Sequence, residues 1–166
     1  MRGLLLVAGL ALTVSPLAAQ RNGSASWMSS PEVVEIRGIV QEVQRGIDSH
    51  AFVRRDSTIC RNTDMETHFS YYVDSLGRIR RFVWKTASED HGEENEYTYD
   101  SAGRLRFIFS SQAATNGSEG EIREYLAPRG RLIHQDVRTT KGAGYPWPSP
   151  NAILHPQETL KLPCED

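Results

Sequence analysis

A turn motif that returns at a regular interval constrains this chain more than any other feature of its sequence. Gly77, Gly103 and Gly130 are 26 and 27 residues apart, and each closes a short turn between two runs of strand-forming residues. Repetition at such an interval is typical of one supersecondary unit placed beside its copies. The unit that this pattern predicts is a β-hairpin, so we expect an antiparallel sheet of neighbouring hairpins.

The central copy, YTYDSAGRLRFIF, runs from Tyr97 to Phe109. Asp100 suits the first position of a type I turn, because its side chain can accept hydrogen bonds from backbone N–H groups two residues on. Gly103 suits the last position, where the backbone reaches positive φ. In the third copy Pro128 takes the second turn position, where its fixed φ fits. The three copies therefore predict the same kind of turn.

At these residues the chain resembles the YD repeats of Rhs-type and teneurin-type proteins, whose pattern is Y-x-Y-D-x-x-G-R-L. The central copy matches this pattern fully from Tyr97 to Leu105, and the resemblance extends over residues 69–137. The first copy has Val73 in place of the second tyrosine, and the third copy lacks both tyrosines and the aspartate. Long arrays of such hairpins form spiralling sheets or shells in that family. Three copies cannot enclose anything, so the resemblance implies hairpins and no particular activity.

A regular register carried outward from the central turn sets the two faces of the sheet. Side chains alternate between faces along a strand, and Tyr97 would then lie opposite Phe107. The predicted core face holds Tyr97, Tyr99, Leu105, Phe107 and Phe109. The second face is rich in aromatic and arginine residues, whereas a sheet covered on one side would be polar there. Candidate binding residues on this second face are Tyr72, Arg80, Phe82, Trp84, Arg106 and Tyr125.

Two interpretations of the second face stay open. Exposed aromatic residues mixed with arginine are typical of interface centres and sugar platforms, which predicts a recognition surface. The alternative is that the C-terminal segment covers this face, through residues such as Tyr145 and Trp147, or that the sheet curls into a half-barrel.

The segment before the hairpins predicts an amphipathic helix that begins near Ser30 and ends near Asp48. Ser30 suits the cap, and Pro31 suits the first turn. The apolar residues at helical spacing are Val33, Ile36, Val40, Val43 and Ile47. We expect this helix to lie across the core face of the hairpins. The predicted fold class is therefore α+β: an N-terminal amphipathic helix packed on an antiparallel β-meander of about six or seven strands.

The N-terminal residues have the composition of a secretory signal. Residues 1–19 contain Arg2, an apolar stretch and small residues before Gln20, and they are too short and Pro-interrupted to span a membrane. We therefore expect a secreted or periplasmic protein with no transmembrane segment. Residues 20–29 would form a loose leader, residues 30–138 the domain, and residues 139–166 a Pro- and Gly-rich tail. An even number of cysteines in an exported chain predicts one disulfide, between Cys60 and Cys164.

No motif for a particular reaction or cofactor is present in the sequence. The five histidines lack the spacing of a metal site, no serine sits in a Gly-x-Ser-x-Gly elbow, and no phosphate-binding glycine loop occurs. A net charge of −2 does not favour nucleic acid as a partner. We expect an exported binding or structural module of the cell envelope with a protein or glycan partner and no cofactor or metal. The alternatives are a small secreted hydrolase with a site between helix and sheet, or an inhibitor of a secreted enzyme.

Overall fold

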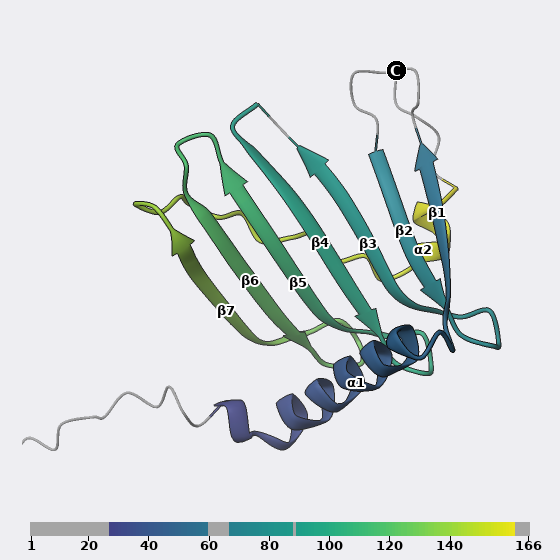
Figure 1. Ribbon diagram of the computed structural model, residues 1–166. Helices are drawn as coiled ribbons and strands as arrows, with labels where there is room; N and C mark the ends of the chain where they lie inside the picture. Colours follow the sequence, from purple (N-terminus) through teal and green to yellow (C-terminus); the bar gives the residue numbers. More distant parts are fainter. Residues whose placement is uncertain (1–26, 60–66, 88, 162–166) are drawn as a thin grey trace, which may run out of the picture.

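The computed structural model describes residues 27–59, 67–87 and 89–161. Within these residues an N-terminal helix packs on an antiparallel meander of seven strands in sequential order, which confirms the predicted α+β fold (Figure 1). The predicted signal segment and both cysteines, Cys60 and Cys164, lie outside the described residues. The elements are η1 (Trp27–Ser29), α1 (Pro31–Asp48), β1 (Val53–Ile59), β2 (Thr67–Val73), β3 (Ile79–Ala87), β4 (His91–Tyr99), β5 (Leu105–Ala114), β6 (Glu119–Leu126), β7 (Leu132–Lys141) and α2 (Pro156–Thr159).

Helix α1 begins and ends where the sequence predicts. The Ser30 hydroxyl accepts a hydrogen bond from the backbone N–H of Val33 at 3.3 Å, which satisfies one of the donors left free at a helix start. Val33, Ile36 and Val43 are buried, so the apolar stripe is the face that packs on the sheet. Figure 1 shows α1 crossing the strands near the end where the three repeated turns lie.

The turn chemistry is also as predicted. At the central turn the N–H of Gly103 donates to the carbonyl of Asp100 at 3.0 Å, and the φ of Gly103 is +77°. The Asp100 carboxylate accepts from the N–H groups of Ala102 and Arg104 at 2.9 and 3.0 Å. Asp74 holds the first turn with the same set of bonds. The aspartate thus organises the loop backbone, and the glycine supplies the conformation that other residues resist.

The predicted register beyond the central turn is wrong by one residue. The pairing skips Arg106, so Tyr97 lies opposite Ile108 rather than Phe107. This irregularity is a β-bulge, in which an extra residue reverses the alternation of faces for the rest of the strand. Phe107 and Phe109 therefore lie on the face opposite Tyr97.

Each of the three repeated hairpins has such an extra residue two positions into its second strand, and each of these residues meets the N-terminal helical segment. Arg80 binds Glu42 and Arg106 binds Glu35, at 2.8 and 2.9 Å. Ile133, the third of them, packs on the apolar cluster that α1 forms with the sheet. The bulges thus turn one side chain per hairpin toward the helix.

Residues 142–161, which we call the strap, run across the face opposite α1 (yellow in Figure 1). The strap places Ile153 among the buried aromatic and aliphatic residues of the sheet, and its carbonyl accepts from the Tyr99 hydroxyl at 2.8 Å. The expectation that α1 lies across the core face with Tyr97 is therefore wrong. The strap covers the Tyr97 face, and α1 covers one end of the other face. The main core contains Phe69, Val73, Ile79, Phe82, Tyr97, Tyr99, Leu105, Ile108, Leu126 and Ile153.

Candidate binding groove

The six candidate binding residues do not share one face. Phe82 and Trp84 lie on the strap side, where Phe82 is completely buried in the main core and Trp84 packs against it. For Phe82 the structure shows the covered alternative, whereas Trp84 is half-buried. The predicted face combined residues from both sides because the bulges, which the regular register ignored, reverse the alternation.

The other four candidates lie on the helix side, and most of them are buried. Arg80 and Arg106 are held by glutamates of α1, and Tyr125 packs under Trp27 with 5.6 Å between the ring centroids. Tyr72 is half-buried opposite Arg81. The structure therefore brings none of the six together as an open aromatic platform.

The part of the helix-side face that α1 leaves uncovered carries a regular set of ion pairs. Two rows of side chains cross the sheet there, and each of their five carboxylates lies within 4 Å of a lysine or arginine. Ion pairs at a protein surface contribute about 0–1 kcal/mol each, so these pairs describe a surface that neutralises its own charge more than a source of stability. The pairs are Asp56 with Arg54 (2.9 Å), Glu94 with Lys85 (2.7 Å), Glu96 with Arg81 (3.5 Å), Glu121 with Arg123 (2.7 Å) and Asp136 with Arg138 (2.6 Å).

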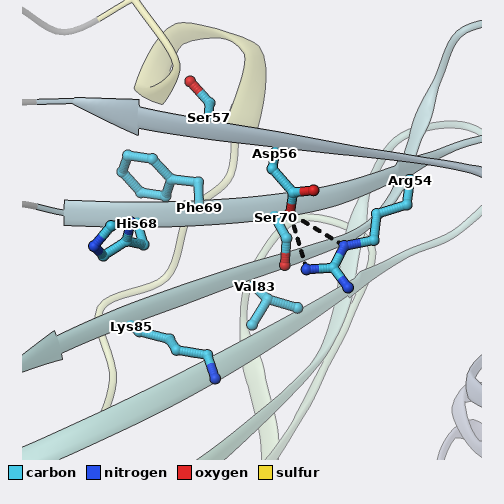
Figure 2. A pocket seen from close by; sticks show the side chains of 8 residues that line it. All are labelled: Arg54, Asp56, Ser57, His68, Phe69, Ser70, Val83 and Lys85. Atoms are coloured by element: carbon cyan, nitrogen blue, oxygen red, sulfur yellow. Dashed lines mark hydrogen bonds and ion pairs between the residues drawn. The ribbon is translucent and has the colours of Figure 1, made fainter.

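A hollow of about 220 Å³ lies on β1, β2 and β3 at one edge of the sheet (Figure 2). Figure 2 shows the Arg54 side chain turned toward Asp56, to which its Nε and Nη2 atoms both donate. The second cation in the hollow, Lys85, is paired with Glu94. Its positive groups are therefore already occupied, and we do not place the candidate site there.

A second hollow follows α1, and one of its two cations, Arg37, has no acidic partner among the described residues. A cavity of about 190 Å³ lies between the helix and the sheet, and a surface depression of about 270 Å³ shares its residues Arg37 and Gln41. We call the two together the helix groove. A Cβ atom added at Gly38 would meet nothing within 4 Å, so the depression is open above this glycine. The groove is lined by Val34, Arg37, Gly38, Val40, Gln41, Phe107, Arg123 and Tyr125.

Two guanidinium groups in the helix groove have N–H donors that no acceptor of the described residues occupies. Arg37 is exposed and has no acidic partner in the part of the chain that the structure describes. Arg123 binds Glu121 through Nη2 and lies 5.1 Å from the centroid of the Phe109 ring, while its Nη1 is buried without a hydrogen-bond partner. A buried donor without a partner is costly, so a ligand that accepts from Nη1 would be stabilised.

The rest of the groove is apolar. Phe107 and Tyr125 lie edge to face with 5.1 Å between their centroids, and Val34 on the helix is 54% exposed. Aromatic residues and arginine around an apolar centre are the composition of protein interfaces. The groove can therefore accept an anionic group at its arginines and an apolar group on its walls.

The sequence contains a signal for this groove that the reasoning from periodicity missed. Val34, Arg37, Gly38 and Gln41 follow the spacing i, i+3, i+4, i+7 and so form a second stripe on α1, beside the core stripe. An apolar residue and a glycine in a stripe that does not face the core indicate a second contact surface. Phe107 was assigned to the core because of the register error.

No helix of the described residues is long and apolar enough to cross a membrane. In the same residues no three histidine, cysteine, aspartate or glutamate side chains gather in a way that could hold a metal ion. Comparisons of the chain with protein-family models, with curated proteins and with solved structures found no match. The resemblance to YD repeats therefore stays a prediction from the motif.

Proposed function

We propose that the chain is an exported binding module of the cell envelope and that its helix groove holds an acidic segment of a partner protein. The observation that carries this proposal is the pair of guanidinium groups with free donors, Arg37 and Arg123, above an aromatic floor. Among the described residues, each carboxylate on the uncovered helix-side face pairs with a lysine or arginine, and Glu121 pairs with Arg123 itself. The groove is thus the place on this face where an unsatisfied positive charge and apolar surface coincide.

The groove suits an acidic peptide better than a glycan. A guanidinium group binds a carboxylate through two parallel hydrogen bonds, and the aliphatic side chain of Val40 can pack on a neighbouring apolar residue of a peptide. A sugar platform needs an open ring face, but Tyr125 is only 7% exposed and Phe107 is half-buried.

The hydrolase alternative places its site in this same space between helix and sheet. General acid–base catalysis needs groups such as a carboxylate or histidine within reach of the substrate. The described residues that line the groove supply guanidinium, amide, aliphatic and aromatic groups, which bind and orient a ligand. This lining supports the binding function. If the bound partner is itself a secreted enzyme, the same contact makes the module an inhibitor.

Site-specific photocrosslinking in envelopes of the producing cell tests the proposal. A photoreactive residue replaces Gln41, which lines the groove, or Asn151 of the strap, a second exposed amide side chain on the opposite face. We expect a discrete protein adduct from position 41 and none from position 151.

A charge reversal makes this test specific for the groove. Arg37→Glu should lower the adduct yield by about tenfold, because a repulsive charge replaces an attractive one at the contact. Arg45→Glu, on the same helix but outside the groove lining, should leave the yield unchanged, and circular dichroism checks that both variants fold. Equal adducts from positions 41 and 151, or a yield that Arg37→Glu does not change, would show the proposal to be wrong.

A further inference from the structure

A cavity of about 380 Å³ lies between the second and third repeated turns, on another part of the molecule from the helix groove. Arg104 lines it from the second turn, Arg129 from the third turn, and His155 from the strap. Gly130 and Leu154 are close enough that a Cβ on the glycine would lie 3.3 Å from the leucine Cδ2. The cavity is thus built by three separate segments of the chain.

The first two turns neutralise their own arginines. Asp74 pairs with Arg78 at 2.7 Å, and Asp100 pairs with Arg104 at 2.8 Å. The same two carboxylates lie 3.9 and 3.6 Å from the bulge arginines that face α1. In these two copies the aspartate, the arginine after the glycine, the bulge arginine and the α1 glutamate that binds it therefore form one charge-balanced unit.

The third turn has lost the acidic part of this unit. Ala127 stands where the other copies have aspartate, and Ile133 stands at the bulge position. Arg131 is kept after the glycine, and Arg129 is added within the turn. Both arginines are exposed, and among the residues described here neither has an acidic partner. The third turn thus presents positive charge that the first two turns cancel.

The contact between the first and second turns also differs from the contact between the second and third turns. Between the first and second turns, Arg78 Nη1 donates to the carbonyl of Ser101 at 2.6 Å and links the two turns. Pro128 is the equivalent of Ser101 in the third turn, and the described structure has no matching bond to it from Arg104. Arg104 binds Asp100 through Nε and Nη2, so its Nη1 is left for another acceptor.

We propose that this cavity binds the oxyanion group of a small molecule that bears a phosphate or a carboxylate. Arg104 and Arg129 hold the oxyanion, and a ring nitrogen of His155 can add a donor. No aspartate or glutamate lines the cavity to compete for these donors. Leu154 and Pro128 supply apolar walls for the rest of the molecule. This site does not depend on the helix groove, so either proposal can fail alone.

Amide NMR shifts of the ¹⁵N-labelled mature chain provide the test. Inorganic phosphate and acetate are titrated separately, with sodium chloride at matched ionic strength as the reference. We expect saturable shifts at Gly103, Gly130 and Leu154 with at least one of the two anions, and the anion that binds more tightly identifies the group that the site accepts. Arg129→Gln should weaken this binding about tenfold, the size expected for losing a hydrogen bond to a charged group.

Arg45→Gln is the matched control, because it removes one exposed arginine from α1 without touching the cavity. Its titration curve should overlay that of the parent chain. The proposal is overturned if neither anion gives saturable shifts at the three amides, if Arg129→Gln binds as the parent does, or if Arg45→Gln weakens binding equally.

Discussion

Arg106 on β5 binds Glu35 on α1 across 71 positions of sequence, with 2.9 Å between Nη1 and Oε1. The arginine side chain is 2% exposed, whereas the glutamate side chain is 59% exposed. Arg106 Nε also donates to the carbonyl of Leu126 at 3.1 Å, and its Nη1 lies 3.6 Å from an oxygen of Asp100. One buried cation therefore joins the helix, a turn and the next hairpin.

This asymmetry predicts unequal effects of removing the two partners. Arg106→Met should lower the free energy of unfolding by about 2–4 kcal/mol, because it leaves buried acceptors without a donor. Glu35→Gln should cost less than about 1 kcal/mol, since its carboxylate is solvated. Urea unfolding measures both, with the exposed Arg138→Met as the control for loss of an arginine. Equal losses for Arg106→Met and Glu35→Gln would contradict the central role of the buried arginine.

The two turn aspartates predict a loss of stability in acid. Burial by itself raises the pKa of Asp100, but hydrogen bonds from the Arg104 side chain and from backbone N–H groups outweigh burial and hold the pKa below its usual range. Asp74 shows the same balance with Arg78. Since the folded-state pKa lies below the unfolded value of about 3.9, this stabilisation is present above that pH and is lost as the pH falls through the folded-state pKa.

Urea unfolding between about pH 6 and pH 2.5 measures this effect around the aspartate pKa range. The double variant Asp74→Asn/Asp100→Asn should be less stable than the parent at pH 6, and its stability should fall less as the pH drops. Glu89→Gln removes an exposed carboxylate of a loop and should leave the slope unchanged. Parallel pH curves for the parent and the double variant would rule out the turns as the source of acid sensitivity.

A close approach between the strap and β6 predicts a position-specific effect of alanine. A Cβ at Gly120 would lie 2.4 Å from the Trp147 ring, whereas a Cβ at Gly92 on β4 would meet only a backbone oxygen at 3.9 Å. Gly120→Ala should therefore destabilise the fold by about 1–3 kcal/mol, the usual cost of overpacking. Gly92→Ala should be neutral or slightly stabilising. Thermal unfolding and tryptophan fluorescence check both, and similar melting temperatures would show that Trp147 does not rest on Gly120.

The Tyr99 hydroxyl predicts how firmly the strap is held. Tyr99→Phe removes its hydrogen bond to the buried backbone at Ile153 and should cost about 1–2 kcal/mol, because the carbonyl loses its partner. Tyr97 is equally buried but has no hydrogen bond at its hydroxyl within the described part of the chain, so Tyr97→Phe is the control. Limited proteolysis of the strap should accelerate only in Tyr99→Phe. Equal cleavage rates in both variants would show that the Tyr99 hydrogen bond does not hold the strap on the sheet.

The sequence was sufficient for the local structure of the fold. Ser30, the apolar stripe of α1 and the Asp100–Gly103 turn each act over a few residues, so their chemistry can be read from neighbours along the chain. The bulge at Arg106 was missed because it does not alter the turn. It changes which face every later residue of the strand occupies, and a regular alternation conceals it. The available signal for the bulges was an arginine three residues after the turn glycine in two copies, Arg80 after Gly77 and Arg106 after Gly103.

The candidate site could be predicted only in part. Tyr125 was identified and lies in the helix groove, but Arg37 was not, because its role depends on where α1 crosses the sheet. The same limit applies to Phe82, which shares its core with Ile153 of the strap, about 70 residues away in sequence. Local patterns name the residues of a surface, while long-range packing decides which of those residues stay uncovered.

The bulge contacts recur at nearly the same distance along the helix and across the sheet. Glu35 and Glu42 are two helical turns apart, a rise of about 10.5 Å, and their partners on β5 and β3 are separated by two strand spacings, about 9.5 Å. A fourth hairpin would therefore extend beyond the helix unless α1 also gained seven residues. Lengthening this fold by duplication requires two matched insertions at distant points of the gene, which limits how readily the array can grow.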